Sequence, residues 1–361
     1  MKHDPIYYGD YLQLDKILGA QELKSAQSGK AAHDETLFII IHQTYELWFK
    51  QIIHEVASVN ELLDGERVEP RSLGVINHRL NRVIEIQRIL NGQLKIIETM
   101  TPLDFMEFRD YLVPASGFQS IQFRIVELKL GLRQKYRGGF AAEFFNSRLR
   151  QEDKDTLEEM EKDTTLLEYV DQWLSRMPFA QMKGYDFWDE YLKEVDKMLD
   201  EDKAMIEANK TLHPKELQFE LMNLNSTREN FHNLFDEKRY QKMLDDGLVR
   251  LSREAKLAAI FINLFSDEPI FQAPNNFLTH LIDIDEMFTA WRNNHAIMAH
   301  RMLGTKIGTG GSSGHEYLKK SAETNRVFLD LFNLATYLIP KSRLPKLPKE
   351  LKRELGFFAE E

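Results

Sequence analysis

Apolar side chains recur along this chain with the spacing of one helix face, and this periodicity limits the possible folds more than any other feature. No succession of alternating strands competes with it, and glycine, proline or aspartate marks the breaks. The sequence therefore predicts an all-α, multi-helix bundle. The predicted helices span Asp34–Leu63, Arg71–Thr99, Leu103–Leu132, Glu216–Leu234, Glu237–Leu264, Asn276–Leu303 and Glu316–Tyr337.

The chain is predicted to form a single domain over residues 1–361, with two unusual segments. Residues 134–212 are richer in charge, but Leu157, Met160, Leu166 and Leu167 keep a helical apolar stripe there. We expect a charged helical excursion in this region and not a binding tail. Residues 340–361 mix three prolines with lysine and arginine, which indicates a surface arm.

Composition excludes several classes of protein. A net charge of −10 without a dense basic stripe argues against nucleic acid as a partner. No apolar run approaches the roughly 20 residues of a membrane span, and the N-terminus lacks a signal-peptide core, so we expect a cytoplasmic protein. Because cysteine is absent, histidine or carboxylate must hold any metal.

One imidazole stands in the middle of an otherwise buried-looking helix. His42 shares its face with Phe38, Tyr45 and Phe49. An unpaired buried polar group costs about 1–3 kcal/mol, so the ring requires a partner. That partner is a backbone carbonyl, a carboxylate, a metal or a bound molecule, and a satisfied core histidine is the simplest of these alternatives.

A second imidazole, His295, lies on the apolar face of a distant helix beside Trp291 and Met298. Two such rings could face each other across a cavity, as in haem sites where one histidine binds the iron and another residue governs the distal side. Core packing is again the alternative. His300 lies off this face, and no HExxH or similar zinc spacing occurs.

An arginine lies beside a predicted aromatic wall. Arg109 follows Phe105 by four residues and Phe108 by one, a setting that suits a clamp on a ligand's carboxylate. Pairing with the neighbouring Asp104, Glu107 or Asp110 is equally compatible with the spacing. The break at residues 114–117 could bring backbone groups and a hydroxyl against a ligand.

The glycine-rich run at residues 308–314 is not a phosphate-binding loop, because no GK[ST] follows and no strand precedes it. Its position after the His295 helix favours a lid that closes over a site. A plain flexible connection is the alternative.

Four segments together match one family. They are YGDYLQLDKILGAQ, HDETLFIIIHQTYELWFKQ, TPLDFMEFRDYLVPASGFQSIQFR and WRNNHAIMAHRMLGTKIGTGGSSG. In these segments, in this order, the chain resembles the tryptophan 2,3-dioxygenase family. The match extends from the N-terminus to residue 314, with a loose correspondence over residues 134–212.

The resemblance implies a haem b in each subunit, with His295 as the proximal ligand and His42 on the distal side near the indole N–H. It further implies that Arg109 binds the substrate carboxylate. The other implied substrate contacts are Phe38, Phe105, Ser116, Gly117 and Thr309, and, from the neighbouring subunit of a homotetramer, Tyr8, Tyr11 and Leu12. Some family members carry tyrosine where this chain has Phe105, so Arg109 must act here without that phenol.

The implied reaction inserts both atoms of O2 across the C2–C3 bond of L-tryptophan and gives N-formyl-L-kynurenine, the first step of tryptophan breakdown by the kynurenine route. Three alternatives compete with it. A haem relative could oxidise another indole or insert one oxygen, a haem carrier would favour a second axial ligand, and a helical scaffold would bind no haem.

Overall fold

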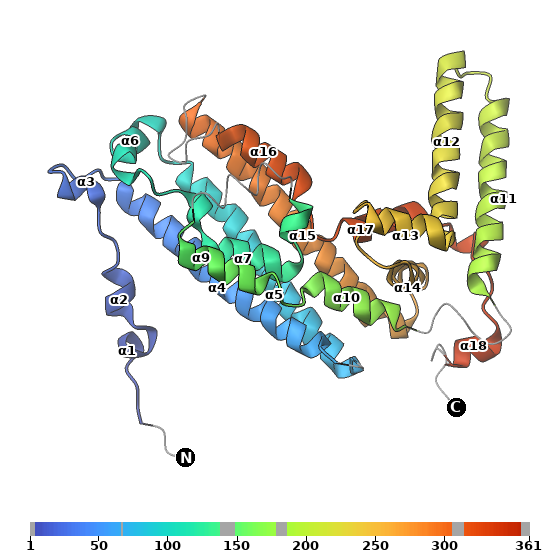
Figure 1. The fold of residues 1–361 in the computed structure, drawn as a ribbon, viewed down its shortest axis with the longest axis horizontal. Coiled ribbons are helices and arrows are strands. Elements are labelled where there is room, and N and C mark those ends of the chain that lie inside the picture. The colour runs from blue at the N-terminus through green and yellow to red at the C-terminus, as the bar shows by residue number, and fades with distance from the viewer. Residues whose placement is uncertain (1–3, 66–67, 138–148, 178–185, 305–313, 355–361) are drawn as a thin grey trace.

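The computed structural model describes residues 4–65, 68–137, 149–177, 186–304 and 314–354, and all regular elements within these ranges are helical. Three long helices form the frame: α4 (Glu35–Leu63), α5 (Pro70–Ile97) and α15 (Pro269–Leu303). Helix α5 packs along both of the others, and Figure 1 shows the three lying side by side. The predicted all-α bundle is confirmed.

The remaining elements are shorter and connect or cover this frame. In chain order they are α1 (Tyr8–Leu12), α2 (Leu14–Leu18), α3 (Lys24–Gln27), α6 (Pro102–Met106), the 3-10 turns η1 (Arg109–Leu112) and η2 (Gly117–Gln119), α7 (Ile121–Leu130), η3 (Gln134–Tyr136), α9 (Gln151–Met160), α10 (Leu166–Ser175), α11 (Phe187–Ala208), α12 (Pro214–Phe235), α13 (Glu237–Asp245), α14 (Arg253–Leu264), α16 (Gly314–Thr324), α17 (Leu329–Phe332), η5 (Asn333–Tyr337), η6 (Lys341–Arg343) and α18 (Lys349–Glu354).

The frame helices are long because their apolar residues keep to one face. On α4, Ile52, Val56 and Val59 follow each other at spacings of four and three, and all are fully buried. Ile76 and Leu80 do the same on α5. Since each such side chain gains about 1.5–3 kcal/mol on burial, the shared face of α4 and α5 stabilises both helices.

The predicted helix Leu103–Leu132 is wrong as a single element. The segment folds into α6, η1, η2 and α7, with the break at Pro114, which lacks a backbone donor. Two serines then start new elements: Ser116 accepts a hydrogen bond from the amide of Phe118, and Ser120 accepts one from Phe123. The chain thereby turns twice before α7 begins.

Two further predicted helices are interrupted by buried carboxylates on other elements. Asp330 accepts the amides of Arg250 and Leu251 and so holds the gap between α13 and α14, within the predicted helix Glu237–Leu264. Asp285 accepts the amides of Val327 and Phe328, after α16 has ended, so Glu316–Tyr337 divides into α16, α17 and η5. In both cases the amide that would have continued a helix bonds to a carboxylate instead.

Helix α15 is longer than predicted. It begins at Pro269, seven residues before Asn276, and continues through Pro274. A proline at the first helical position lacks only an N–H that would have no helical partner there. The extra turns extend the surface that α15 presents to α5.

The charged segment over residues 134–212 is helical in its described parts, as predicted, and its row of apolar side chains is partly buried. Leu166 and Leu167 on α10 are buried, whereas Leu157 and Met160 on α9 are half-buried. Helices α11 and α12 form an antiparallel pair that extends away from the frame (Figure 1). The predicted extent of the single domain is not tested by these observations and stays a prediction.

Beyond Pro340, Leu347 is buried, so the predicted surface arm packs in part against the body.

The N-terminal segment is joined to the body by a buried cluster of hydrogen bonds around Glu35. Glu35, at the first turn of α4, accepts hydrogen bonds from the amides of Lys24 and Ser25 and from the Ser25 hydroxyl. On the N-terminal side of this cluster, α1 and α2 contain no buried residue and extend away from the bundle (Figure 1). No described helix is long and apolar enough to cross a membrane.

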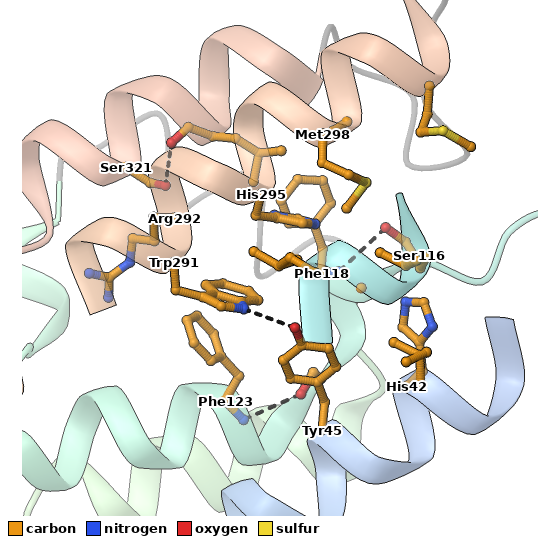
Figure 2. Close-up of a pocket in the computed structure, with 18 of the residues that line it drawn as sticks. His42, Tyr45, Ser116, Phe118, Phe123, Trp291, Arg292, His295, Met298 and Ser321 are labelled. Atoms are coloured by element: carbon orange, nitrogen blue, oxygen red, sulfur yellow. Dashed lines mark hydrogen bonds between the residues drawn. The ribbon is translucent and has the colours of Figure 1, made fainter. Parts of the chain in front are cut away.

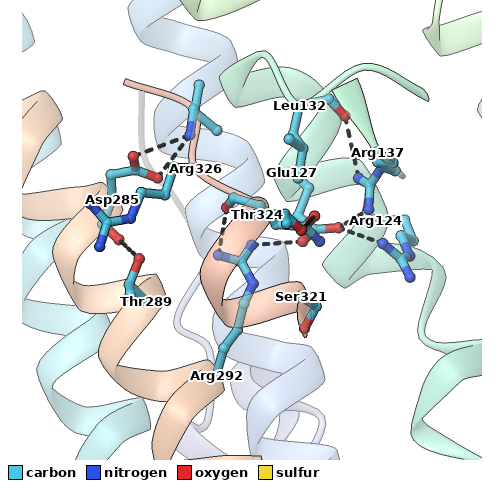
Figure 3. A network of polar contacts seen from close by, with 12 residues as sticks. Arg124, Glu127, Leu132, Arg137, Asp285, Thr289, Arg292, Ser321, Thr324 and Arg326 are labelled. Atoms are coloured by element: carbon cyan, nitrogen blue, oxygen red, sulfur yellow. Dashed lines mark hydrogen bonds and ion pairs between the residues drawn. The ribbon is translucent and has the colours of Figure 1, made fainter. Parts of the chain in front are cut away.

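One buried carboxylate joins three parts of the fold (Figure 3). Glu127 of α7 pairs with Arg124 at 2.8 Å, with Arg137 after η3 at 2.8 Å, and with Arg292 of α15 at 2.7 Å. Arg292 also donates to the carbonyl of Asn325, directly after α16, at 2.9 Å. Burial alone would raise the pKa of Glu127, but the three guanidinium charges outweigh it and hold this pKa well below its usual range.

Replacing Glu127 by glutamine should lower the free energy of unfolding by about 3–5 kcal/mol at pH 7, because three buried cations lose their counter-charge. The depressed pKa stabilises the fold above pH 4.5 and its contribution fades below that value. Denaturant unfolding of both proteins should therefore show a difference that shrinks on acidification.

The matched control is Glu190→Gln, which breaks an exposed pair with Lys193. It should change stability by less than about 0.5 kcal/mol. A Glu127→Gln protein as stable as this control would contradict the assignment.

Candidate functional site

An apolar cavity of about 310 Å³ lies among α4, α7, α15 and α16, and the end of α5 closes one side. Both singled-out histidines line it, His42 from α4 and His295 from α15 (Figure 2). The prediction that rings on two distant helices share a cavity is confirmed. The remaining lining is mainly aromatic and aliphatic, as in sites for flat ligands.

His42 is held in one tautomer. Its Nδ1 lies 2.7 Å from the carbonyl of Phe38. Because a carbonyl only accepts, Nδ1 carries the hydrogen and Nε2 keeps a lone pair. Desolvation lowers the pKa of His42, against smaller opposing effects of the Phe38 carbonyl and Glu46, so the ring stays neutral at physiological pH. The site thus contains a neutral hydrogen-bond acceptor.

Three phenylalanines form a wall beside His42. Phe38 lies 4.2 Å from the His42 ring between centroids, 5.7 Å from Phe105 and 5.5 Å from Phe108. The ring of Phe108 is fully buried and meets Phe105 edge to face at 5.4 Å. This mutual packing fixes the plane of the wall before any ligand binds.

A short turn supplies polar groups to the same cavity. The Ser116 amide donates to the Gln119 side chain, and its hydroxyl accepts from the Phe118 amide. A Cβ on Gly117 would meet no atom within 4 Å, so the turn leaves open space there. Both Ser116 and Gly117 line the cavity.

His295 is supported mainly by packing. Trp291, one turn earlier on α15, stacks on it with centroids 5.0 Å apart and planes inclined by 11°. Its Nδ1 is enclosed and finds no hydrogen-bond partner among the described residues. Burial and the proximity of His42 lower the pKa of His295 to about 4. A neutral imidazole of this kind is a suitable axial ligand for haem iron.

The donor set fits a haem better than a bare metal ion. The described residues contain no group of three or more histidine or carboxylate side chains that could hold a metal. A haem needs only one protein ligand, and His295, within apolar walls, has the chemistry to be that ligand. Arg124 and Arg292 also line the cavity, where they could meet the haem carboxylates.

The other predicted residues lie around or outside this cavity. Arg109 begins η1 beside the phenylalanine wall, half-buried, with Nη1 4.0 Å from the Met106 sulfur, but it is not among the described residues that line the cavity. Thr309 and the glycine-rich run up to residue 313 fall outside the described residues. Tyr8 and Tyr11 are 71% and 70% exposed on the N-terminal segment, and Leu12 is 36% exposed.

Sequence reasoning did not assign a site role to several cavity residues. Tyr45 and Trp291 were visible only as neighbours of the histidines at helical spacing, which suggested core packing. Arg124, Glu127 and Arg292 gave no sequence signal, because their pairing depends on contacts between separate helices.

An apolar cavity between helices is typical of helical haem enzymes when one neutral imidazole faces another whose Nδ1, among the described residues, has no hydrogen-bond partner. The family model for tryptophan 2,3-dioxygenase matches residues 2–338. The chain belongs to the tryptophan 2,3-dioxygenase family. Enzymes of this family are haem dioxygenases that oxygenate tryptophan to N-formylkynurenine, and this chain is an enzyme of that class.

Relatives from distant organisms match over nearly the full length. The chain is 51% identical to a tryptophan 2,3-dioxygenase of Alteromonas mediterranea over 98% of both sequences. It is 47% identical to one of Dictyostelium discoideum, over 98% of this chain and 88% of the relative. A third, from Rattus norvegicus, is 44% identical over 95% of this chain and 84% of the relative.

Replacing His295 by alanine should abolish stable haem binding, because no cysteine exists and no other residue offers a neutral imidazole on this face. Haem content and the absorption spectrum of the purified protein measure the effect. His300→Ala, an exposed change on the same helix, is the control and should keep the wild-type spectrum. A normal histidine-ligated spectrum in His295→Ala would move the ligand elsewhere.

Proposed function

We propose that each chain binds one haem b and one L-tryptophan in the cavity between α4 and α15, and inserts both atoms of O2 across the indole C2–C3 bond there. The observation that carries this proposal is the pair of neutral imidazoles from two helices in one aromatic-walled cavity. His295 would be the iron ligand. Bound haem supplies the oxygen activation, and the protein binds, orients and excludes water.

The tautomer of His42 sets the orientation of the indole. Since Nδ1 is engaged by the Phe38 carbonyl, Nε2 is the atom available to accept the indole N–H. The Phe38 and Phe105 rings would stack along the indole and restrict its plane. Together these contacts would place C2 and C3 toward the haem.

The zwitterionic end of the substrate needs charged and polar partners. Arg109 emerges beside the phenylalanine wall and would bind the carboxylate, while Ser116, Gly117 and Thr309 would complete the polar side. Because both oxygen atoms end in the product, no external electron donor is consumed. A non-catalytic haem carrier is less well supported, since such a protein has no use for a carboxylate clamp or an open distal side.

The direct test is turnover of L-tryptophan by the ferrous haem-loaded protein, followed by the absorbance of N-formylkynurenine. Carbon monoxide should bind the reduced protein, because an open sixth position is required. A protein that binds haem but gives no product, or that cannot bind carbon monoxide, would contradict the proposal.

Replacing Arg109 by leucine should lower kcat/KM for tryptophan, because the carboxylate would lose its charge-assisted partner. The loss should correspond to about 2–4 kcal/mol in the activation free energy. Haem content should not change. Tryptamine, which lacks the carboxylate, is the control substrate and should lose much less activity. Equal losses for both compounds would show that Arg109 supports the structure only.

We also propose that the chain assembles as a homotetramer in the cytoplasm, and that the N-terminal segment of one subunit completes the site of its neighbour. The exposed Tyr8 and Tyr11 support this, because two large aromatic groups on a segment without buried residues gain nothing in a monomer. Within the described part of the chain, hydrogen bonds join the segment to its own body near residues 20–35, where Gln21 bonds to Gln43 at 2.7 Å and Gln43 donates to the Ala20 carbonyl at 3.1 Å.

Deleting residues 1–12 should therefore impair tetramer formation and catalysis together, while haem binding through His295 survives at least in part. Gel filtration coupled to light scattering measures assembly, and turnover measures the site. A full-length protein that is fully active as a monomer near 42.4 kDa would contradict the shared site.

A further inference from the structure

Tyr45 and Trp291 form a rigid connection between the two histidine helices. The indole N–H of Trp291 on α15 donates to the Tyr45 hydroxyl on α4 at 3.4 Å (Figure 2). That hydroxyl in turn donates to the Leu90 carbonyl on α5 at 2.6 Å. All three frame helices thus meet in one hydrogen-bonded chain. Tyr45 is buried, and its hydroxyl is used as donor and acceptor at once.

The Trp291 ring is also clamped by other aromatic groups. Tyr45 meets it edge to face at 6.0 Å, and Phe123 of α7 packs on it at 5.3 Å. Phe123 in turn contacts Phe49 and Phe288. A ring held by two aromatic neighbours and by its N–H is restricted to one orientation.

The stack on His295 transmits this orientation to the imidazole. The two rings are nearly parallel, and they come from positions four apart on one helix, where side chains lie one above the other. Metal-binding histidines usually donate their second N–H to an acceptor that fixes the ring. Among the described residues, none accepts from His295 Nδ1. Packing on Trp291 is therefore what fixes this ring within the described part of the chain.

We propose that Tyr45 and Trp291 are positioning residues for the haem ligand: Tyr45 orients Trp291, and Trp291 sets the ring plane of His295. The inference rests on the proposed function, in which His295 binds the iron. It assigns no contact with substrate to either residue, and Tyr45 acts only through Trp291. A loosened imidazole would bind iron with a distribution of orientations and weaker overlap.

The test compares Tyr45→Phe, Trp291→Phe and the double variant with a matched control. Tyr240→Phe is that control, because its hydroxyl also donates to a buried backbone carbonyl, that of Leu251, at 2.9 Å, away from the cavity. The main readout is the iron–histidine stretching band of the ferrous protein in resonance Raman spectra. Haem retention against an apo-globin acceptor, kcat, KM and thermal stability are measured alongside.

Tyr45→Phe and Tyr240→Phe should lose similar thermal stability, since each removes one buried hydrogen bond. Only Tyr45→Phe and Trp291→Phe should shift or broaden the iron–histidine band. Haem retention or kcat should fall by about 10-fold in these two variants, with KM near the wild-type value. The double variant should match Trp291→Phe, because in this proposal Tyr45 acts on His295 only through Trp291.

An unchanged band in loaded Tyr45→Phe protein, an equal shift in Tyr240→Phe, or additive effects in the double variant would each overturn the inference. Should Trp291→Phe fail to fold, the comparison of Tyr45→Phe with Tyr240→Phe decides alone. The proposed function fails separately and earlier, because a wild-type protein without a histidine-ligated haem spectrum would contradict it before any variant is made.

Discussion

The Glu127 carboxylate is the constraint on which the interior depends. A lone buried carboxylate would be strongly unfavourable, but here three guanidinium groups pair with it. Because the partners come from α7, from the segment after η3 and from α15, the charges can be paired in only one arrangement of these elements. Arg292 is three residues from His295, so this arrangement also fixes the position of α15 along its axis relative to α7.

The apolar walls of the cavity also keep its histidines neutral. Both imidazole pKa values are lowered by desolvation, and His42 is further committed to one tautomer by the Phe38 carbonyl. Neutral rings can accept a hydrogen bond or bind a metal, whereas protonated rings can do neither. The apolar walls thus determine the chemistry of the site as well as its shape.

The body and the N-terminal segment differ in how they are stabilised. The frame helices bury continuous apolar faces, while α1 and α2 bury none; the segment that carries them is joined to the body by the hydrogen bonds around Glu35 and by those of Gln43 with Gln21 and Ala20. An anchored base with an exposed aromatic end is suited to reach another molecule. The proposed shared site would give those aromatic groups the burial that they lack in a single chain.

The sequence by itself determined the helical class, the positions of α4, α5 and α12, and the presence of His42 and His295 on apolar faces, because helix periodicity is a local property. Its motifs also led to the family. Only the tertiary structure decided where the predicted helices break, since Asp285 and Asp330 capture amides from segments about 40 and 80 residues away. The same holds for the partners of Glu127 and the Tyr45–Trp291 bond. Such contacts join residues that are distant in sequence, and no local pattern specifies which buried polar groups will meet.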